Sequence, residues 1–330
     1  MSFTKTTKYL VGILLSFLFL SSSAPDEYPS AEITNGLIRA RLYLPDRDAG
    51  FYRGSRFDWA GVMPELEYQG HTYFGKWYAE VHDPAFHDHI AGPVEEFTPL
   101  AYDDAKPGEP FLKIGVGVLV KADEEQYRFA KPFKNINSGT WKVKKKKDQV
   151  EFLQTLEHQG YSYQYRKTVH LVKDKPEMVL SHSLKNDGTK TITTSVYNHN
   201  FFVMDDQTIG PDFDVAFPFT LIGETPSTGP LGRLQDNKIL FEKELGSADH
   251  LFFRSLTGFS SNASDYDIKI ENHKTGAAVR ITCDQPLSKI VFWSAHKTLC
   301  PEPYIKLEVK PGETVSWKIV YQFNTPSVGK

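Results

Sequence analysis

Apolar and polar residues alternate along many short stretches of this chain. The alternation is cleanest at residues 161–165, where three tyrosines are separated by Ser162 and Gln164. A period of two, with many β-branched and aromatic residues, is typical of strands that bury one face. Stretches of this kind lie at residues 33–44, 113–121, 149–153, 161–165, 168–172, 178–184, 191–197, 266–271, 278–283, 289–295 and 314–323.

No long segment has a 3.6-residue period, and strands do not alternate with helices, so a parallel α/β sheet is not expected. Many short antiparallel strands predict an all-β sandwich or barrel. No linker rich in Ser, Gly or Pro divides the chain, so residues 25–330 are predicted to form a single β domain. Asn186-Asp187-Gly188 predicts a hairpin, and Pro311-Gly312 predicts another turn.

Residues 1–24 have the character of a secretory signal peptide. Lys5 and Lys8 form a basic start, residues 9–20 are mostly apolar, and residues 21–24 offer small side chains for cleavage. The apolar run is short for a membrane span. We therefore expect export to the periplasm or the cell exterior, with no membrane span after cleavage. An uncleaved N-terminal anchor is the alternative.

The composition fits a globular protein, with 24% charged and 40% hydrophobic residues in a chain of 330. Loss of Lys5 and Lys8 with the signal changes the formal net charge from −3 to −5. A mildly acidic protein is not expected to bind nucleic acid, and the lysines at 142–147 fit a solvated strand end. The aromatic share of 13% suits both packing between sheets and carbohydrate binding.

The chain has two cysteines, Cys283 and Cys300, and export would permit a disulfide between them. Residues 281–283 and 289–295 are predicted to be adjacent strands joined by a turn at Gln285-Pro286. In that arrangement Cys300 lies beyond the level of Cys283. The sequence leaves this pairing open.

His199 stands at the end of a predicted strand, between Asn198 and Asn200 and close to aromatic residues. Imidazole exchanges a proton near pH 7. Asparagine side chains can bond sugar hydroxyls as donor or acceptor. This combination suits proton transfer on a sugar, and the alternative is a hydrogen-bonded turn.

Glu302 is a candidate acid/base partner for His199. It lies between Pro301 and Pro303, in a stretch predicted to be a rigid loop. A histidine and a carboxylate that are distant in sequence form one acid/base pair when the fold brings them together. The alternative is an exposed loop carboxylate.

Together, and in their order, these motifs resemble the aldose 1-epimerase (galactose mutarotase-like) family. The resemblance extends over residues 141–323. It implies a large twisted antiparallel β-sandwich, the supersandwich of that family, with a sugar cleft on one face. The motifs are Trp141-Lys142-Val143, Lys185-Asn186-Asp187-Gly188, Asn198-His199-Asn200-Phe201-Phe202, Cys300-Pro301-Glu302-Pro303, Lys310-Pro311-Gly312-Glu313 and Tyr321-Gln322-Phe323.

The resemblance also implies roles for two residues. His199 would be the general acid that protonates the ring oxygen, and Glu302 the base that takes the proton of the anomeric hydroxyl. The ring opens, the aldehyde turns, and reclosure gives the other anomer. This isomerase chemistry requires no metal or cofactor.

The chain departs from the family pattern shortly before Trp141. Members usually carry a second histidine there, whereas this chain has Lys131-Pro132-Phe133-Lys134-Asn135. Lys134 can hydrogen-bond a sugar, but an ammonium group is not equivalent to an imidazole. The departure favours a charged or modified sugar, or a different reaction on the same scaffold.

The segment from Gly50 to Gly61 contains further candidate ligand contacts. Arg53 and Arg56 can clamp a carboxylate, sulfate or phosphate, and Trp59 can stack on a sugar. The alternative is an arginine that pairs with Asp58 to brace a turn. Trp293, in the predicted strand at 289–295, is another aromatic candidate for sugar contact.

His87 and His89 belong to the densest group of histidines and carboxylates, between His82 and Glu96. At positions i and i+2 on one strand face, both could ligate a metal. No third ligand has a fixed spacing to them, so no metal site is predicted. One of them can instead replace the missing family histidine in the cleft, or the segment is a solvated loop.

The sequence thus favours an aldose 1-epimerase-like isomerase that acts on a mono- or oligosaccharide, with an acidic sugar as one reading. Two alternatives remain open. One is a non-catalytic carbohydrate-binding protein, and the other is a polysaccharide lyase or hydrolase that uses the same cleft.

Overall fold

The computed structural model describes residues 28–224 and 230–324. The predicted signal peptide lies outside the described residues. Those residues form antiparallel sheets together with one 3₁₀ turn, η1 (Ala263–Asp265). None of the helical structure described has the length and hydropathy required to cross a membrane. The prediction of an all-β antiparallel fold is confirmed.

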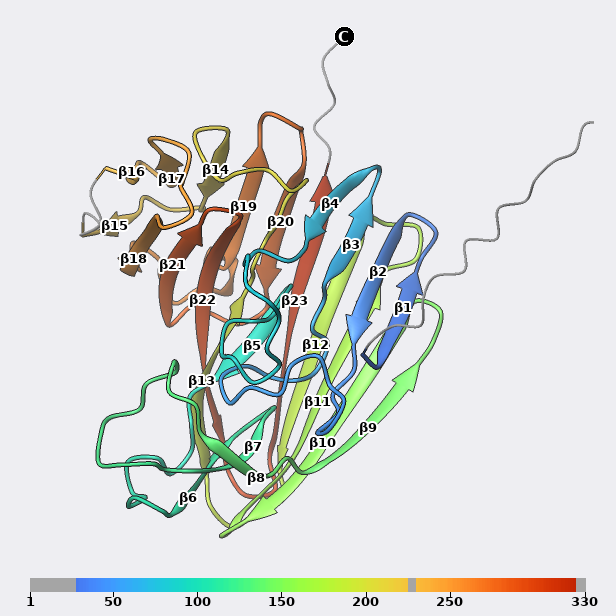
Figure 1. Ribbon diagram of the computed structural model, residues 1–330, viewed down its shortest axis with the longest axis vertical. Helices are drawn as coiled ribbons and strands as arrows, with labels where there is room; N and C mark the ends of the chain where they lie inside the picture. The colour runs from blue at the N-terminus through green and yellow to red at the C-terminus, as the bar shows by residue number, and fades with distance from the viewer. Residues whose placement is uncertain (1–27, 225–229, 325–330) are drawn as a thin grey trace, which may run out of the picture.

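The largest sheet has ten strands, and its long strands β10, β11, β12 and β23 run side by side (Figure 1). Buried positions alternate with partly exposed ones along β10 and β11, because one face of this sheet lies against the core. In spatial order its strands are β16 (Gly232–Gln235), β17 (Lys238–Phe241), β14 (Phe213–Ala216), β19 (Asp267–Asn272), β20 (Ala278–Cys283), β23 (Thr314–Asn324), β12 (Glu177–Asn186), β11 (Tyr161–Leu171), β10 (Gln149–His158) and β9 (Thr140–Lys145).

A second sheet of six strands packs on the first, through contacts of β22 with β12 and β23. Val196 and Ile305 from this sheet meet Trp317 and Ile319 from the first sheet, and all four are buried. In spatial order its strands are β15 (Ile222–Gly223), β18 (His250–Thr257), β21 (Lys289–Ala295), β22 (Thr298–Val309), β13 (Ile192–His199) and β5 (Val94–Phe97).

Two smaller sheets complete the described structure. The four-stranded sheet touches β10 through β1, and the Thr34 amide donates a hydrogen bond of 2.8 Å to the Lys147 carbonyl. The strands of the four-stranded sheet are β1 (Ser30–Thr34), β2 (Ile38–Tyr43), β3 (Glu65–Tyr68) and β4 (His71–Phe74). The three-stranded sheet consists of β6 (Pro110–Lys113), β7 (Gly117–Val120) and β8 (Lys134–Asn137).

The two faces of β5 lie against different apolar cores. Phe97 belongs to the main core between the large sheets, whereas Val94 belongs to a second core with Phe57, Phe111 and Phe201. The second core exists because the loops before β5 and the three-stranded sheet cover part of the outer face of the six-stranded sheet. That covered face carries the site described below.

Two predictions about connections are wrong. Asn186-Asp187-Gly188 does not make a hairpin, because β12 and β13 belong to different sheets. The strands β20 and β21 also lie in different sheets, rather than side by side. Turn residues reverse the chain locally but do not determine which sheet the next strand joins. Cys283 and Cys300 are both buried free thiols.

Candidate functional site

Glu302 lies in the strand β22, so the prediction of a loop is wrong. Pro301, Glu302 and Pro303 pair in continuous register with Phe292, Val291 and Ile290 of β21. Proline has no N–H to give to a ladder, so two prolines within three residues argue against a central strand. Here β22 continues on both sides of them, and the Asn200 side-chain amide donates to the Pro301 carbonyl at 2.7 Å.

His199 stands opposite Glu302 on the neighbouring strand. The register of β13 on β22 pairs Tyr197 with Tyr304, and continuing it by two residues brings His199 level with Glu302. Residues two apart on a strand point to the same face. The Nε2 atom of His199 is 3.3 Å from Oε1 of Glu302, and both residues are buried.

The pair lies at a hollow of about 710 Å³ on the outer face of the six-stranded sheet. A second hollow of about 570 Å³ shares Phe129, Tyr197, Lys289 and Tyr304 with it. Alternate residues of four neighbouring strands line the first hollow, and loops supply Arg56, Asp88 and Phe129. The strand residues are His250, Phe252 and Arg254 of β18, Lys289, Val291 and Trp293 of β21, Glu302 and Tyr304 of β22, and Tyr197 and His199 of β13.

Aromatic rings enclose the imidazole of His199. Phe201 stacks on it with ring centroids 3.8 Å apart, and Phe57 meets it edge-on at 5.5 Å. The backbone of Phe201 has a φ of +35°, which turns the chain directly after β13. Burial lowers the pKa of His199 well below its usual value, and the nearby positive charge of Arg56 lowers it further. At pH 7 the imidazole is therefore neutral.

Burial has the opposite effect on the carboxyl group of Glu302. It raises the pKa of Glu302 to about 8, against the opposing influence of Arg56. At pH 7 the carboxyl is therefore mostly protonated. At pH 7 the pair therefore has one protonated group, the Glu302 carboxyl, and one group able to accept a proton, the His199 imidazole, as an acid/base pair requires.

Arg56 is held rigidly in the wall of the hollow. Its Nε donates to Glu96 at 2.8 Å, its Nη2 donates to Tyr197 at 3.2 Å, and its Nη1 pairs with Asp88. Lys113 pairs with the other oxygen of Glu96 at 2.8 Å. Burial alone would raise the pKa of Glu96, but Lys113 and Arg56 lower it to about 2. Arg56 is thus a fixed positive charge beside His199 and Glu302.

Asn198 and Asn200 do not reach the hollow, although they flank His199. Asn198 donates to the Tyr321 hydroxyl at 3.1 Å, and that hydroxyl donates to Asn200 at 2.7 Å. Both amides are buried and used inside the fold. Their contact with a sugar, which the sequence predicted, has no geometric basis here.

Arg53 and Trp59 also lie away from the hollow. Arg53 is partly exposed and donates to the Asp48 carbonyl. Trp59 is buried and donates from Nε1 to the Gly54 carbonyl at 2.9 Å. Of the candidates in this segment, Arg56 is the one that lines the hollow, and Trp293 lines it from β21.

His87, His89 and Lys134 do not line the hollow either. Residues 84–88 form turns rather than a strand, so the two histidines do not share a strand face. The Nε2 atom of His87 lies 3.2 Å from Oδ2 of Asp88, and Nδ1 of His89 accepts a hydrogen bond from the Asp83 amide at 2.8 Å. Lys134 is exposed at the start of β8.

Sequence reasoning missed Tyr304, Lys289, Arg254 and His250. The sequence feature that could have identified them is the period-two spacing of residues that share one face of a strand. Lys289 lies four residues before Trp293, and Tyr304 lies two residues after Glu302, so each pair shares a face. The register that brings β18 next to β21 is a tertiary property, and no local pattern predicts it.

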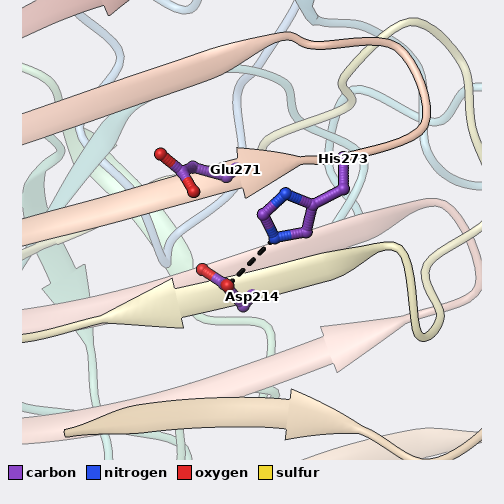
Figure 2. A group of neighbouring side chains, drawn as sticks. All are labelled: Asp214, Glu271 and His273. Carbon is purple, nitrogen blue, oxygen red and sulfur yellow. Dashed lines mark hydrogen bonds and ion pairs between the residues drawn. The ribbon is translucent and has the colours of Figure 1, made fainter. Parts of the chain in front are cut away.

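Asp214, Glu271 and His273 form a separate group of potential metal ligands, shown in Figure 2. Their ligand atoms lie within 4.8 Å of one another. His273 is 3.0 Å from Oδ2 of Asp214, and Lys238 places its ammonium group 2.8 Å from the same oxygen. Because Lys238 already supplies the positive charge, these side chains are accounted for as an ion-paired cluster.

Solved structures with the same architecture have low sequence identity to this chain. A galactose mutarotase-like protein from Clostridium acetobutylicum aligns with a TM-score of 0.55 at 16% identity, covering 90% of this chain and 95% of its own. The chain has the galactose mutarotase-like fold. The resemblance predicted from the sequence motifs is confirmed at the level of fold.

Two further structures share the galactose mutarotase-like fold with this chain. A galactose mutarotase related enzyme from Lactobacillus acidophilus gives a TM-score of 0.52 at 13% identity, covering 91% of this chain and 99% of its own. An aldose epimerase homologue from C. elegans gives a TM-score of 0.51 at 14% identity, covering 90% of this chain and 98% of its own. No protein-family model and no curated sequence matches the chain.

Proposed function

We propose that this protein interconverts the anomers of a sugar, with His199 and Glu302 as the acid/base pair. The observation that carries the proposal is the 3.3 Å approach of these two groups at a hollow large enough for a sugar. The fold supports it, because the similar structures include proteins named as galactose mutarotase-like or aldose epimerase.

The reaction needs one proton donor and one proton acceptor. The donor protonates the ring oxygen while the acceptor removes the proton of the anomeric hydroxyl, so that the C1–O5 bond breaks and C1 becomes an aldehyde. Rotation about C1–C2 and the reverse proton transfers close the ring as the other anomer. Both oxygens are bonded to C1, so two carriers a few ångströms apart reach both.

The resting location of the proton differs from the one that the family resemblance implies. The resemblance makes His199 the acid, whereas the pKa of Glu302, raised by burial to about 8, leaves the proton on the carboxyl at pH 7. The interconversion of anomers is reversible, so each of the two groups donates a proton in one direction of the reaction and accepts one in the other. The rate should therefore follow the protonation state of the pair rather than that of either residue alone.

Arg56 contributes a fixed charge to this chemistry. Its guanidinium is oriented by Asp88, Glu96 and Tyr197 before any ligand arrives. Preorganised positive charge in a site that excludes water stabilises oxygen atoms on which negative charge develops. In the proposed reaction these are the anomeric and ring oxygens.

Anomer exchange by NMR in a panel of monosaccharides tests the proposal. Wild-type protein is expected to accelerate exchange for at least one sugar, and Glu302→Gln and His199→Ala to abolish the acceleration. Glu308→Gln serves as the matched control, because Glu308 lies on the same strand but is exposed. Full activity of the Glu302→Gln variant would refute the assignment.

Carbohydrate binding without catalysis is the second candidate. The observation in its favour is that no residue of the segment at 131–135 lines the hollow, so the second histidine of the family pattern has no replacement there. Sugar-induced chemical shift changes without faster exchange would support this candidate. Loss of exchange on mutation of His199 would exclude it.

A further inference from the structure

Two basic side chains in the hollow have no acidic partner among the residues that the structure describes. Arg254 and Lys289 are exposed on β18 and β21, and neither makes an ion pair with any described carboxylate. Their cationic groups lie over aromatic rings, Arg254 at 5.7 Å from the centroid of Phe252 and Lys289 at 5.1 Å from that of Tyr304. The ring contacts hold the charges at the hollow without neutralising them.

The acidic groups that line the same hollow do not offset these charges. Asp88 is already paired with Arg56 and lies 3.2 Å from His87. Glu302 is mostly uncharged at pH 7, because burial raises its pKa to about 8. The hollow as a whole is therefore positive, although the chain has a net formal charge of −3.

The position of Lys289 relative to the acid/base pair sets the size of a ligand that could use both. Lys289 pairs with Tyr304 across the sheet, and Tyr304 lies two residues from Glu302 on β22. Two strand residues span about 7 Å. This is comparable to the separation between the anomeric carbon and a substituent at the far side of the same sugar ring.

We propose that the hollow binds a sugar with a negatively charged substituent, a carboxylate, sulfate or phosphate, and that Lys289 and Arg254 bind this group. The sugar part of the inference rests on the proposed function, and the anionic part rests on the unpaired cations. Trp293 lines the same hollow from β21, half-buried and with its ring centroid 5.9 Å from that of His199, and supplies an apolar surface for the sugar ring.

Matched neutral and anionic sugars test the inference. The dissociation constants of galactose and galacturonate, and of glucose, glucose 6-phosphate and glucose 6-sulfate, are measured by NMR titration at low and high salt. We expect at least one anionic sugar to bind more tightly than its neutral counterpart, and the preference to shrink with added salt. The arm with the largest preference identifies the anionic group.

Substitutions then locate the contact. Lys289→Met and Arg254→Gln are each expected to weaken the preferred anionic sugar about fivefold while leaving its neutral counterpart within about twofold. Lys318→Met is the charge-matched control, because Lys318 is exposed on β23 in the other large sheet. Equal weakening of neutral and anionic sugars, or equal affinity of the wild type for both, would overturn the inference.

The two proposals fail in different ways in these experiments. Anionic sugars that bind through Lys289 and Arg254 without faster anomer exchange would refute the catalytic proposal and support the inference. Suppose instead that the protein accelerates anomer exchange equally for neutral and anionic sugars, and that Lys289→Met changes no affinity. That result would support the catalytic proposal and refute the inference of an anionic substituent.

Discussion

Replacing Glu302 with glutamine should stabilise the fold while removing the proposed activity. The carboxyl group is buried on the outer face of β22, and burial raises its pKa from 4.5 to about 8. A raised pKa in the folded state means that the group binds its proton more tightly there than in the unfolded chain. Its contribution to stability is therefore fully present below about pH 4.5 and is lost progressively as the pH rises to about 8.

The size of the effect follows from the same shift. Each pKa unit corresponds to about 1.4 kcal/mol, so ionisable Glu302 lowers the free energy of unfolding by about 3 kcal/mol between pH 4.5 and pH 7. The loss reaches about 5 kcal/mol above pH 8. Glutamine has a similar shape and no charge to desolvate, so the variant should lack this part of the pH dependence.

Urea unfolding of the wild type and of Glu302→Gln between pH 4.5 and pH 9 measures it. The difference between the two free energies of unfolding is the relevant quantity, because the other titrating groups cancel in it. We expect this difference to grow with pH in favour of the variant, whereas Glu308→Gln should track the wild type. A difference that does not change with pH would show that the pKa of Glu302 is not raised in the folded state. The assignment of a proton to the Glu302 carboxyl at pH 7 would then be refuted.

Three further predictions address the same region. The rate of anomer exchange should fall above about pH 8, where Glu302 loses its proton, and fall again in acid, where His199 gains one; a rate still rising at pH 9 would contradict the shared proton. Glu96→Gln should lower the free energy of unfolding by about 3 to 5 kcal/mol, because it leaves Arg56 and Lys113 buried without their carboxylate, and unchanged urea midpoints would exclude this. Trp293→Ala should weaken sugar binding about tenfold in NMR titrations without lowering the melting temperature by more than a few degrees, since its ring is only half-buried, and unchanged affinity would remove it from the binding surface.

Strand positions were largely predictable, because the evidence for them is local. The predicted stretches at 278–283 and 289–295 coincide with β20 and β21, and the stretch at 314–323 falls one residue short of β23. A half-buried strand shows its alternation in its own residues. The stretch at 161–165 extends to Leu171 as one strand, β11, so boundaries were less well predicted than existence.

Sheet membership was not predictable, because it depends on contacts between distant residues. The strand β22 reads as a loop on account of Pro301 and Pro303, and yet it lies in the middle of the six-stranded sheet. The same limit explains the candidate site. His199 and Glu302 were recognisable as chemistry-bearing residues, whereas Lys289 and Arg254 gain their significance only from the register of β21 against its neighbours.

The segment around Lys134, where this chain lacks the second histidine of the family pattern, lies apart from the groups that the proposed proton transfer uses. The proposed reaction needs a donor, an acceptor and a positive charge beside the oxygens. His199, Glu302 and Arg56 supply these from β13, β22 and the loop before β3, and none of them contacts the segment at 131–135 through a hydrogen bond or ion pair within the described residues. Lys134 itself is exposed on β8. The departure from the family pattern therefore leaves the proposed acid/base pair complete. It also leaves in place the cations Lys289 and Arg254, which line the hollow from other strands.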